Sequence, residues 1–170
     1  VSELLDFNKE KPIVFAQISG PSGTKRKLTE IIIKVAENLS DKFIFVISKG
    51  QVGGKDKPRK IRGGWVYDWC PIKDELFTLS DILVIRGGHA TISQAILYGK
   101  PVVTIPIRNH SEQLANSLRV AEIGFGKMVF PDSMSINKVS QAINQAYSDD
   151  QIKEKILELK KIAENLNGIQ

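Results

Sequence analysis

The chain has 170 residues, enough for one domain built around a single core. Its composition, 42% apolar and 25% charged, is typical of a soluble globular protein, and it contains no apolar run near the roughly 20 residues of a membrane-spanning helix. The single cysteine, Cys70, excludes an internal disulfide framework and indicates a reducing compartment, so we expect a cytoplasmic protein. Two histidines and one cysteine are too few for a zinc site, and we expect no metal.

The net charge of +5 raises the question of an anionic partner. The densest basic cluster, residues 55–62, contains Pro58 and no aromatic side chain. We interpret it as a solvated loop. An acidic partner or peripheral association with an anionic membrane surface, at its cytoplasmic face, is left open, and we expect no nucleic-acid binding.

Residues 1–11 are mixed and polar and are expected to be the end of a linker, within a longer polypeptide because the chain begins with Val1. Apolar runs rich in β-branched residues predict strands at residues 12–18, 43–47, 65–67, 82–85, 101–106 and 127–130. Helical periodicity predicts helices at residues 25–39, 74–79, 91–98 and 111–121, one capped by Ser135, and one at 150–166. A loop rich in glycine and lysine separates the second and third strands.

The apolar positions of each predicted helix indicate its buried face. Leu28, Ile32 and Val35 recur at helical spacing in the first long helix. In the helix at residues 111–121, Leu114, Leu118 and Ala121 fall on one side and are expected to face the core. The last helix is expected to turn Ile152, Ile156, Leu159 and Ala163 inward.

Strands that alternate with helices imply right-handed crossovers, so residues 12–170 are expected to form an α/β domain with a Rossmann-like open parallel sheet and helices on both faces. Ligands of such sheets bind beyond the carboxyl ends of the strands. Residues 17–24, 68–74, 86–94 and 106–113 each follow a predicted strand. We therefore expect these four segments to meet at one edge.

The segment after the strand at residues 82–85 reads Arg-Gly-Gly-His-Ala-Thr and opens a helix. Arg86 can supply positive charge to a diphosphate, the amides from Gly88 onward can line it, and Thr91 can add a hydroxyl. Gln94, one turn further on, can reach ribose hydroxyls. The alternative is a glycine turn with Thr91 as the helix cap.

The turn after the first strand reads Ser19-Gly20-Pro21-Ser22-Gly23-Thr24. Its glycines permit close approach of a ligand, and its hydroxyls can donate to phosphate or sugar oxygens. It is neither a Walker loop nor a dinucleotide fingerprint, because the Gly-Lys-Ser/Thr ending and the G-x-G-x-x-G spacing are both missing. The alternative is a tight turn in which Ser or Thr caps the following helix.

Two further segments complete the predicted edge. His110, Glu112 and Gln113 open a helix, where a carboxylate beside an amide can hold sugar hydroxyls, or where the acid simply favours the helix start. Trp69 and Cys70 end a strand, and exposed backbone there can read a base edge, although Trp69 is as easily explained as a core residue. Cys70 has no basic partner in the sequence that would make it a nucleophile.

The region from residue 65 to 126 resembles the C-terminal, donor-binding half of GT-B glycosyltransferases, most nearly the MurG-like and UDP-glycosyltransferase families of the family 28 C-terminal type. The resemblance rests on a series of matched positions: Arg86-Gly87-Gly88, Thr91, Gln94, Gly99-Lys100-Pro101, Pro106 and Glu112-Gln113. The family position at Gln94 is usually Glu, so the ribose contact loses a charge here. Many UDP-glycosyltransferases have His where Arg86 stands, although MurG-like members have Arg.

The resemblance implies a domain that binds a nucleotide sugar, most often a UDP-sugar, for transfer of a hexosyl or N-acetylhexosaminyl group to an acceptor hydroxyl without a metal or other cofactor. The residues implied at the donor are Ser19, Gly20, Gly23, Thr24, Trp69, Cys70, Arg86, Gly87, Gly88, His89, Ala90, Thr91, Gln94, His110, Glu112 and Gln113. The acceptor site and catalytic base are expected in an N-terminal domain or a partner subunit, so this chain alone is expected to be inactive. Two alternatives remain: a UDP-GlcNAc 2-epimerase-like domain and a non-catalytic nucleotide-sugar-binding or interaction module.

Overall fold

The computed structural model describes residues 10–168. Within that range the chain forms one sheet, whose strands are β1 (Ile13–Gln17), β2 (Ile44–Ser48), β3 (Arg59–Ile61), β4 (Gly64–Tyr67), β5 (Ile82–Ile85), β6 (Val102–Thr104) and β7 (Gly126–Met128). The strand order is β3-β4-β2-β1-β5-β6-β7, and every neighbouring pair is parallel except β3 and β4. The predicted linker lies almost wholly outside the described residues.

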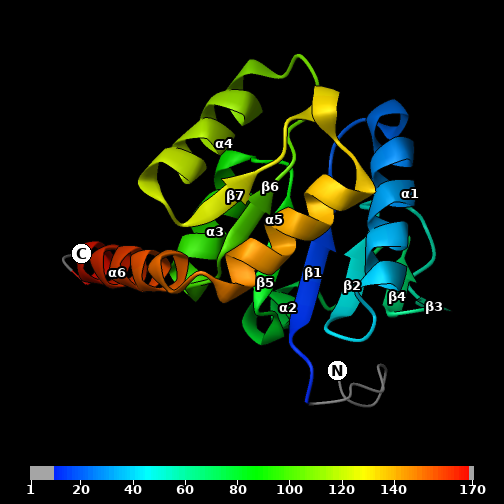
Figure 1. Cartoon of the computed structure of the whole chain (residues 1–170), viewed down its shortest axis with the longest axis horizontal. Coiled ribbons are helices and arrows are strands. Elements are labelled where there is room, and N and C mark those ends of the chain that lie inside the picture. The colour runs from blue at the N-terminus through cyan, green and yellow to red at the C-terminus, as the bar shows by residue number, and fades with distance from the viewer. Residues whose placement is uncertain (1–9, 169–170) are drawn as a thin grey trace.

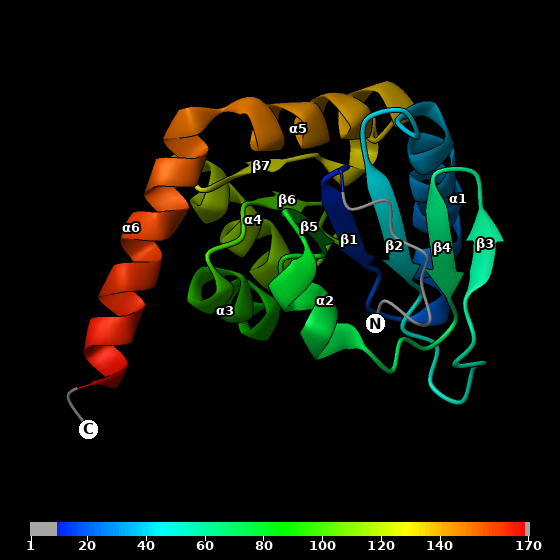
Figure 2. The same cartoon turned by 90° about the horizontal axis from the view of Figure 1, so that it is seen from below.

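Helices cover both faces of the sheet (Figures 1 and 2). Their bounds are α1 (Ser22–Asn38), α2 (Lys73–Leu79), α3 (His89–Tyr98), α4 (Ser111–Ile123), α5 (Ile136–Ser148) and α6 (Asp150–Asn167), with a 3₁₀ turn at Pro131–Ser133. α1 and α5 bury their apolar sides in one core, and α2, α3, α4 and the start of α6 meet a second core on the opposite face. The predicted Rossmann-like α/β fold is therefore confirmed.

The apolar pattern of α1 places its buried face correctly, and that of α6 does so at its first two positions, while Leu159 and Ala163 are half-buried. Leu28, Ile32 and Val35 of α1 are fully or almost fully buried, as are Ile152 and Ile156 of α6. Ser135 caps α5 as expected, because its hydroxyl oxygen accepts from the backbone N–H of Lys138 at 3.1 Å. No helix within residues 10–168 combines the length and apolar character needed to cross a bilayer.

The basic segment at residues 55–62 is not the plain loop that we expected. Residues 59–61 form β3, which pairs antiparallel with β4 and is the edge strand of the sheet. Arg62 and Gly63 make the two-residue connection, a length typical of hairpins. The strand is hard to see in the sequence because two of its three residues are exposed cations, which is common where an edge must resist pairing with other chains.

The predicted buried face of α4 is wrong. Leu114, Leu118 and Ala121 are exposed, and the buried residues are Gln113, Ser117 and Val120. The reason is local: Gln113 and Ser117 lie against the turn after β5, where a bulky apolar side chain would not fit. Tertiary packing has overridden the amphipathic pattern.

Two helices begin earlier than predicted, and neither has the expected cap. α1 begins at Ser22 behind Pro21, and α3 begins at His89 behind Gly88; no side chain caps either helix. Thr91 is therefore inside α3, which excludes its alternative role as the cap. Thr24 is inside α1 and donates its hydroxyl to Pro21 O at 2.8 Å. The first backbone N–H groups of both helices receive no side-chain acceptor.

Candidate functional site

The four predicted segments follow the carboxyl ends of β1, β4, β5 and β6. These strands are mutually parallel, so their arrowheads point the same way, towards the top of Figure 1. The turns after them consequently lie along one edge of the sheet. The order of the strands then decides which turns touch.

Three of the turns are in direct contact. Arg86, after β5, donates from Nη1 to Thr24 O, beyond β1, at 3.4 Å. Asn116 of α4 donates to Gly87 O at 3.1 Å. A Cβ placed on Gly20 would lie 2.6 Å from Cδ1 of Ile107, in the segment after β6. The structure thus brings together the segments that hold Gly20, Thr24, Arg86, Gly87 and the start of α4.

The fourth turn, after β4, lies two strands away from β1 and contacts a different loop. The N–H of Trp69 donates to Lys55 O at 3.2 Å, and Lys49 Nζ lies 2.7 Å from a carboxylate oxygen of Asp68. The hydrogen bond from Lys49 holds the pKa of Asp68 below its ordinary value. Trp69 is 45% exposed, so it is not a core residue, whereas Cys70 is buried.

Arg86 is the most unusual group at this edge. Its side chain is buried, with 5% of the residue exposed, and Nε has no hydrogen-bond partner. Burial lowers the pKa of Arg86 to about 10. It forms no ion pair with any carboxylate of residues 10–168. A buried cation is costly unless an anion compensates it, and Arg86 therefore points to an anionic ligand.

A hollow of about 390 Å³ opens beside Arg86. Thr24 and Gly23 line one side, and Ile105, Pro106 and Ile107 line another. Lys27 and Arg108 add two more cations to its wall, although Arg108 is paired with Asp132 at 2.9 Å. The sequence interpretation missed both residues; their positive charge in segments already assigned to the site was the available signal.

Gly87 allows α4 to approach the turn after β5. Its φ is +88°, and a Cβ there would lie 2.5 Å from the hydroxyl oxygen of Ser117. Any side chain at residue 87 would push α4 away from the turn. The glycine thus fixes the distance between the start of α3 and the start of α4.

The start of α3 presents unsatisfied backbone donors. Gly88 is its N-cap, its first turn carries no acidic residue, and His89 and Ala90 are exposed. Thr91 and Gln94 are half-buried on the following turn. Free N–H groups and the helix dipole both favour an anion here. Ser19, Gly20 and Gly23 are likewise exposed on the neighbouring turn.

At the start of α4, some polar residues make hydrogen bonds within the protein and others face solvent. His110 caps the helix, accepting from Gln113 N–H at 3.3 Å through Nδ1. Gln113 is buried, and its Oε1 accepts from Ile107 N–H at 2.9 Å, which holds the segment after β6 in place. Glu112 is exposed beside them. Contact of these residues with a sugar stays a prediction, and Glu112 is the side chain that is free to make it.

The thiol of Cys70, next to this edge, is buried. Burial raises the pKa of Cys70 to about 11, so its thiol is protonated near neutral pH. No group of three or more His, Cys, Asp or Glu side chains within residues 10–168 is placed to hold a metal. The site is instead one of backbone donors, hydroxyls and cations.

Known proteins match this chain in sequence. An uncharacterised glycosyltransferase of Methanopyrus kandleri is 39% identical over 72 residues, which are 42% of this chain and 21% of that protein. A UDP-N-acetylglucosamine--N-acetylmuramyl-(pentapeptide) pyrophosphoryl-undecaprenol N-acetylglucosamine transferase of Bacillus cereus is 25% identical over 96% of this chain and 44% of its own length. The chain thus spans less than half the length of these relatives.

Solved structures agree with the fold. The glycosyltransferase of kitacinnamycin superposes with a TM-score of 0.75 at 18% identity, covering 89% of this chain and 38% of that one. The calicheamicin glycosyltransferase gives 0.74 at 16% identity, with 89% and 39% covered. The likeness is one of fold, and it covers less than half of each of these glycosyltransferases. Residues 18–166 match the glycosyltransferase family 28 C-terminal domain, and the chain belongs to that family.

Proposed function

We propose that this chain binds a nucleotide-sugar donor, a UDP-sugar, for transfer of its hexosyl or N-acetylhexosaminyl group to an acceptor hydroxyl. The observation that carries the proposal is the buried guanidinium of Arg86 beside a hollow at the carboxyl edge, because it forms no ion pair within residues 10–168 and its Nε has no hydrogen-bond partner. The two uncapped helix starts nearby supply further donors for a diphosphate. The family to which the chain belongs supports the choice of a sugar nucleotide.

The ligand's parts are assigned along the edge. Arg86, the amides from Gly88 to Ala90, and Thr91 hold the diphosphate, with Ser19, Gly20, Gly23 and Thr24 on its other side. Gln94 holds the ribose and Glu112 the sugar, while His110 fixes the start of α4 and the buried Gln113 holds the segment after β6. The backbone at Cys70, with Trp69 beside it, holds the base.

The chemistry required of this chain is stabilisation of a leaving group. In an inverting transfer the acceptor hydroxyl attacks the anomeric carbon while the bond from that carbon to the diphosphate oxygen breaks. Negative charge then grows on the departing nucleoside diphosphate. By this proposal the Arg86 guanidinium and the N-terminus of α3 stabilise that charge, which is the role that a metal plays elsewhere. We propose that no metal or other cofactor is needed.

The acceptor side is proposed to come from another domain. The relatives are more than twice as long as the matched segment, which supports a preceding acceptor-binding domain or a partner subunit that carries the catalytic base. The transferase of Bacillus cereus is named for an acceptor linked to undecaprenol, which supports a cytoplasmic location at the membrane face. By this proposal the chain alone binds donor but transfers nothing.

Thermal unfolding with UDP, UDP-GlcNAc, UDP-glucose, GDP and ADP tests the proposal. A ligand that binds only the folded chain at a hundredfold excess over its Kd stabilises it by about 2.7 kcal/mol. We expect UDP and at least one UDP-sugar to raise the unfolding temperature more than GDP or ADP. A chain indifferent to all five nucleotides would overturn the proposal and favour an interaction module.

Glu112→Ala separates the sugar contact from the nucleotide contacts. The side chain is exposed and makes no structural hydrogen bond in the helix, so the variant should fold normally. We expect weaker binding of the preferred UDP-sugar and unchanged binding of UDP, measured by calorimetric titration. Equal losses for both ligands would contradict a role for Glu112 at the sugar.

A further inference from the structure

The positive charge of the chain is concentrated in one segment. The whole sequence has 24 Lys and Arg and 19 Asp and Glu; residues 49–62 hold six and one of these, which leaves 18 of each elsewhere. The entire net charge of +5 therefore falls on the loop after β2 and on the β3–β4 hairpin. We refer to residues 49–62 as the basic hairpin segment.

Most of its cations are not engaged by the rest of the protein. Lys49 is paired with Asp68, but Lys55, Lys57, Arg59 and Arg62 are exposed and have no ion pair within residues 10–168. Lys60 lies 5.9 Å from the centre of the Trp65 ring and is also exposed. Free cations on both sides of an edge strand form a strongly positive surface.

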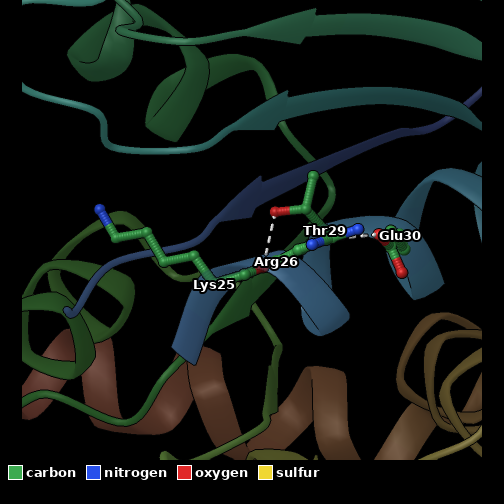
Figure 3. A network of polar contacts seen from close by, with 4 residues as sticks. All are labelled: Lys25, Arg26, Thr29 and Glu30. Carbon is green, nitrogen blue, oxygen red and sulfur yellow. Dashed lines mark hydrogen bonds and ion pairs between the residues drawn. The ribbon is translucent and has the colours of Figure 1, made fainter. Parts of the chain in front are cut away.

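The neighbouring wall of α1 is different, because both of its cations make contacts within the protein. A hollow of about 470 Å³ separates α1 from this segment. Lys25 donates to Gly50 O at 2.8 Å, which ties the loop to α1, and Arg26 is paired with Glu30 at 3.2 Å (Figure 3). Thr29 turns its hydroxyl to Lys25 O. The uncompensated charge therefore belongs to the hairpin side, from residue 55 onward.

An apolar tip adjoins these cations. Gly54 N–H donates to Gln51 O at 3.0 Å, so Val52 and Gly53 occupy the centre of a tight turn. Val52 is 87% exposed, the highest value for a large apolar side chain among the described residues. Gln51 N–H donates to Asp68 O, and Trp69 N–H donates to Lys55 O, which places the turn beside the exposed Trp69.

Protection of the sheet edge explains only part of this arrangement. Lysine and arginine on β3 would suffice to prevent edge-to-edge pairing. Edge protection gives no reason to expose an aliphatic side chain at the tip of the turn, or a tryptophan next to it. An aliphatic tip, exposed lysines in the same segment and an exposed tryptophan beside it together match the boundary of a bilayer.

We propose that the basic hairpin segment docks this chain on an anionic membrane surface, with Val52 and Trp69 entering the headgroup layer and Lys55, Lys57 and Lys60 contacting lipid phosphates. A nucleic-acid partner fits less well: stacking platforms need several aromatic rings, and a phosphate backbone gains nothing from Val52. None of these three lysines belongs to the proposed donor site, whereas Trp69 is named in both proposals, so the lysine variants test docking apart from donor binding.

Co-sedimentation with vesicles tests the proposal. The chain should bind vesicles of phosphatidylcholine mixed with phosphatidylglycerol, and not vesicles of phosphatidylcholine alone. Each lysine near an anionic surface contributes about fivefold to binding, so K55Q/K57Q/K60Q should weaken it on the order of 100-fold. The matched control K34Q/K138Q/K161Q removes the same charge from exposed lysines elsewhere and should bind nearly as well as the parent chain.

Two further measurements test the apolar tip and the choice of partner. Val52→Ser should weaken vesicle binding by roughly tenfold while leaving the charge unchanged. In a Trp65→Phe background, Trp69 is the sole tryptophan, and its emission should shift to the blue on binding mixed vesicles.

Four results would overturn docking on the membrane: no binding to mixed vesicles, equal binding to neutral vesicles, equal losses in the two triple variants, or tight binding of single-stranded RNA without vesicle binding. UDP stabilisation of K55Q/K57Q/K60Q should match that of the parent chain. The donor proposal and the docking proposal can therefore fail independently.

Discussion

The buried cations at the two edges of the sheet differ in how fully their hydrogen-bond donors are satisfied by the protein. At the amino ends of β5 and β6, Lys100 is half-buried and burial lowers its pKa, yet its Nζ donates to Thr78 O at 2.8 Å. Asp81 at the same edge accepts from Ile13 N–H at 2.8 Å. At the carboxyl ends, Arg86 is more deeply buried; its Nη1 donates to Thr24 O at 3.4 Å, but its Nε has no partner.

The volume of the neighbouring hollow does not distinguish the two edges. A hollow of about 320 Å³ lies at the amino edge, close in volume to the hollow of about 390 Å³ beside Arg86. What differs is whether the polar groups are satisfied by the protein itself. The amino edge uses its charges to tie strands and helices together, whereas the carboxyl edge leaves the Nε of Arg86 without a partner.

Arg86→Met should have the largest effect on UDP binding, and it should remove the difference between the two edges of the sheet. Methionine keeps much of the side-chain volume and removes the buried charge. We expect UDP to bind more weakly by on the order of 100-fold, because charged partners in desolvated sites are worth several kcal/mol. The free chain should be as stable as the parent or more so. Calorimetric titration and urea unfolding of the same samples measure both; undiminished UDP binding would contradict the assignment.

Gln113→Ala should lower the free energy of unfolding more than it weakens UDP binding. The change leaves the buried N–H of Ile107 without its acceptor at 2.9 Å. An unsatisfied buried donor costs about 1–3 kcal/mol, which urea unfolding resolves. Glu112→Ala is the matched control on the adjacent, exposed residue. Equal stability of the two variants would show that Gln113 does not hold the segment after β6.

Lys100→Met at the amino edge should show the converse of Arg86→Met. The variant loses the hydrogen bond to Thr78 O, and we expect a loss of stability of about 1 kcal/mol. UDP binding should not change, because the residue lies at the far end of the strands. A reduced affinity for UDP would mean that the edges communicate or that the donor site is misplaced.

The smallest effect is expected at Cys70, in the reactivity of its thiol and in the pH dependence of the free energy of unfolding. Its folded pKa is about 11 against an ordinary value of 9.0, so the native thiol reacts slowly with iodoacetamide near neutral pH. Between those two values the folded state binds the proton more strongly, and stability therefore falls as pH rises. Cys70→Ser should remove this slope. Rapid alkylation of the native chain would contradict the burial of the thiol.

The fold was largely predictable from the sequence because doubly buried parallel strands leave continuous apolar runs. Residues 44–47 and 82–85 are examples, and both are almost fully buried. β3 was missed because it is short, lies at the edge and carries exposed cations. The face of α4 was missed because its inward positions serve the turn at Gly87, so Ser117 replaces the apolar residue that a periodic pattern requires.

The site was predictable as a set of segments and less so as individual side chains. Strand order alone places the segments after β1, β5 and β6 together, and the contacts of Arg86, Gly20 and Asn116 agree. Lys27 and Arg108 depend on how α1 and the segment after β6 face each other, which periodicity does not specify. The same holds for Gln113, whose amide is used by the backbone of Ile107.

The uneven charge at the β3 edge of the sheet affects how this molecule is oriented as it approaches a charged surface. A body whose whole charge excess lies at one end, with a balanced remainder, behaves as a large electric dipole. Near any negatively charged body it will rotate so that the hairpin leads. Since the field decays over about 8 Å at physiological ionic strength, this orientation takes place only in the last steps of approach and vanishes in concentrated salt.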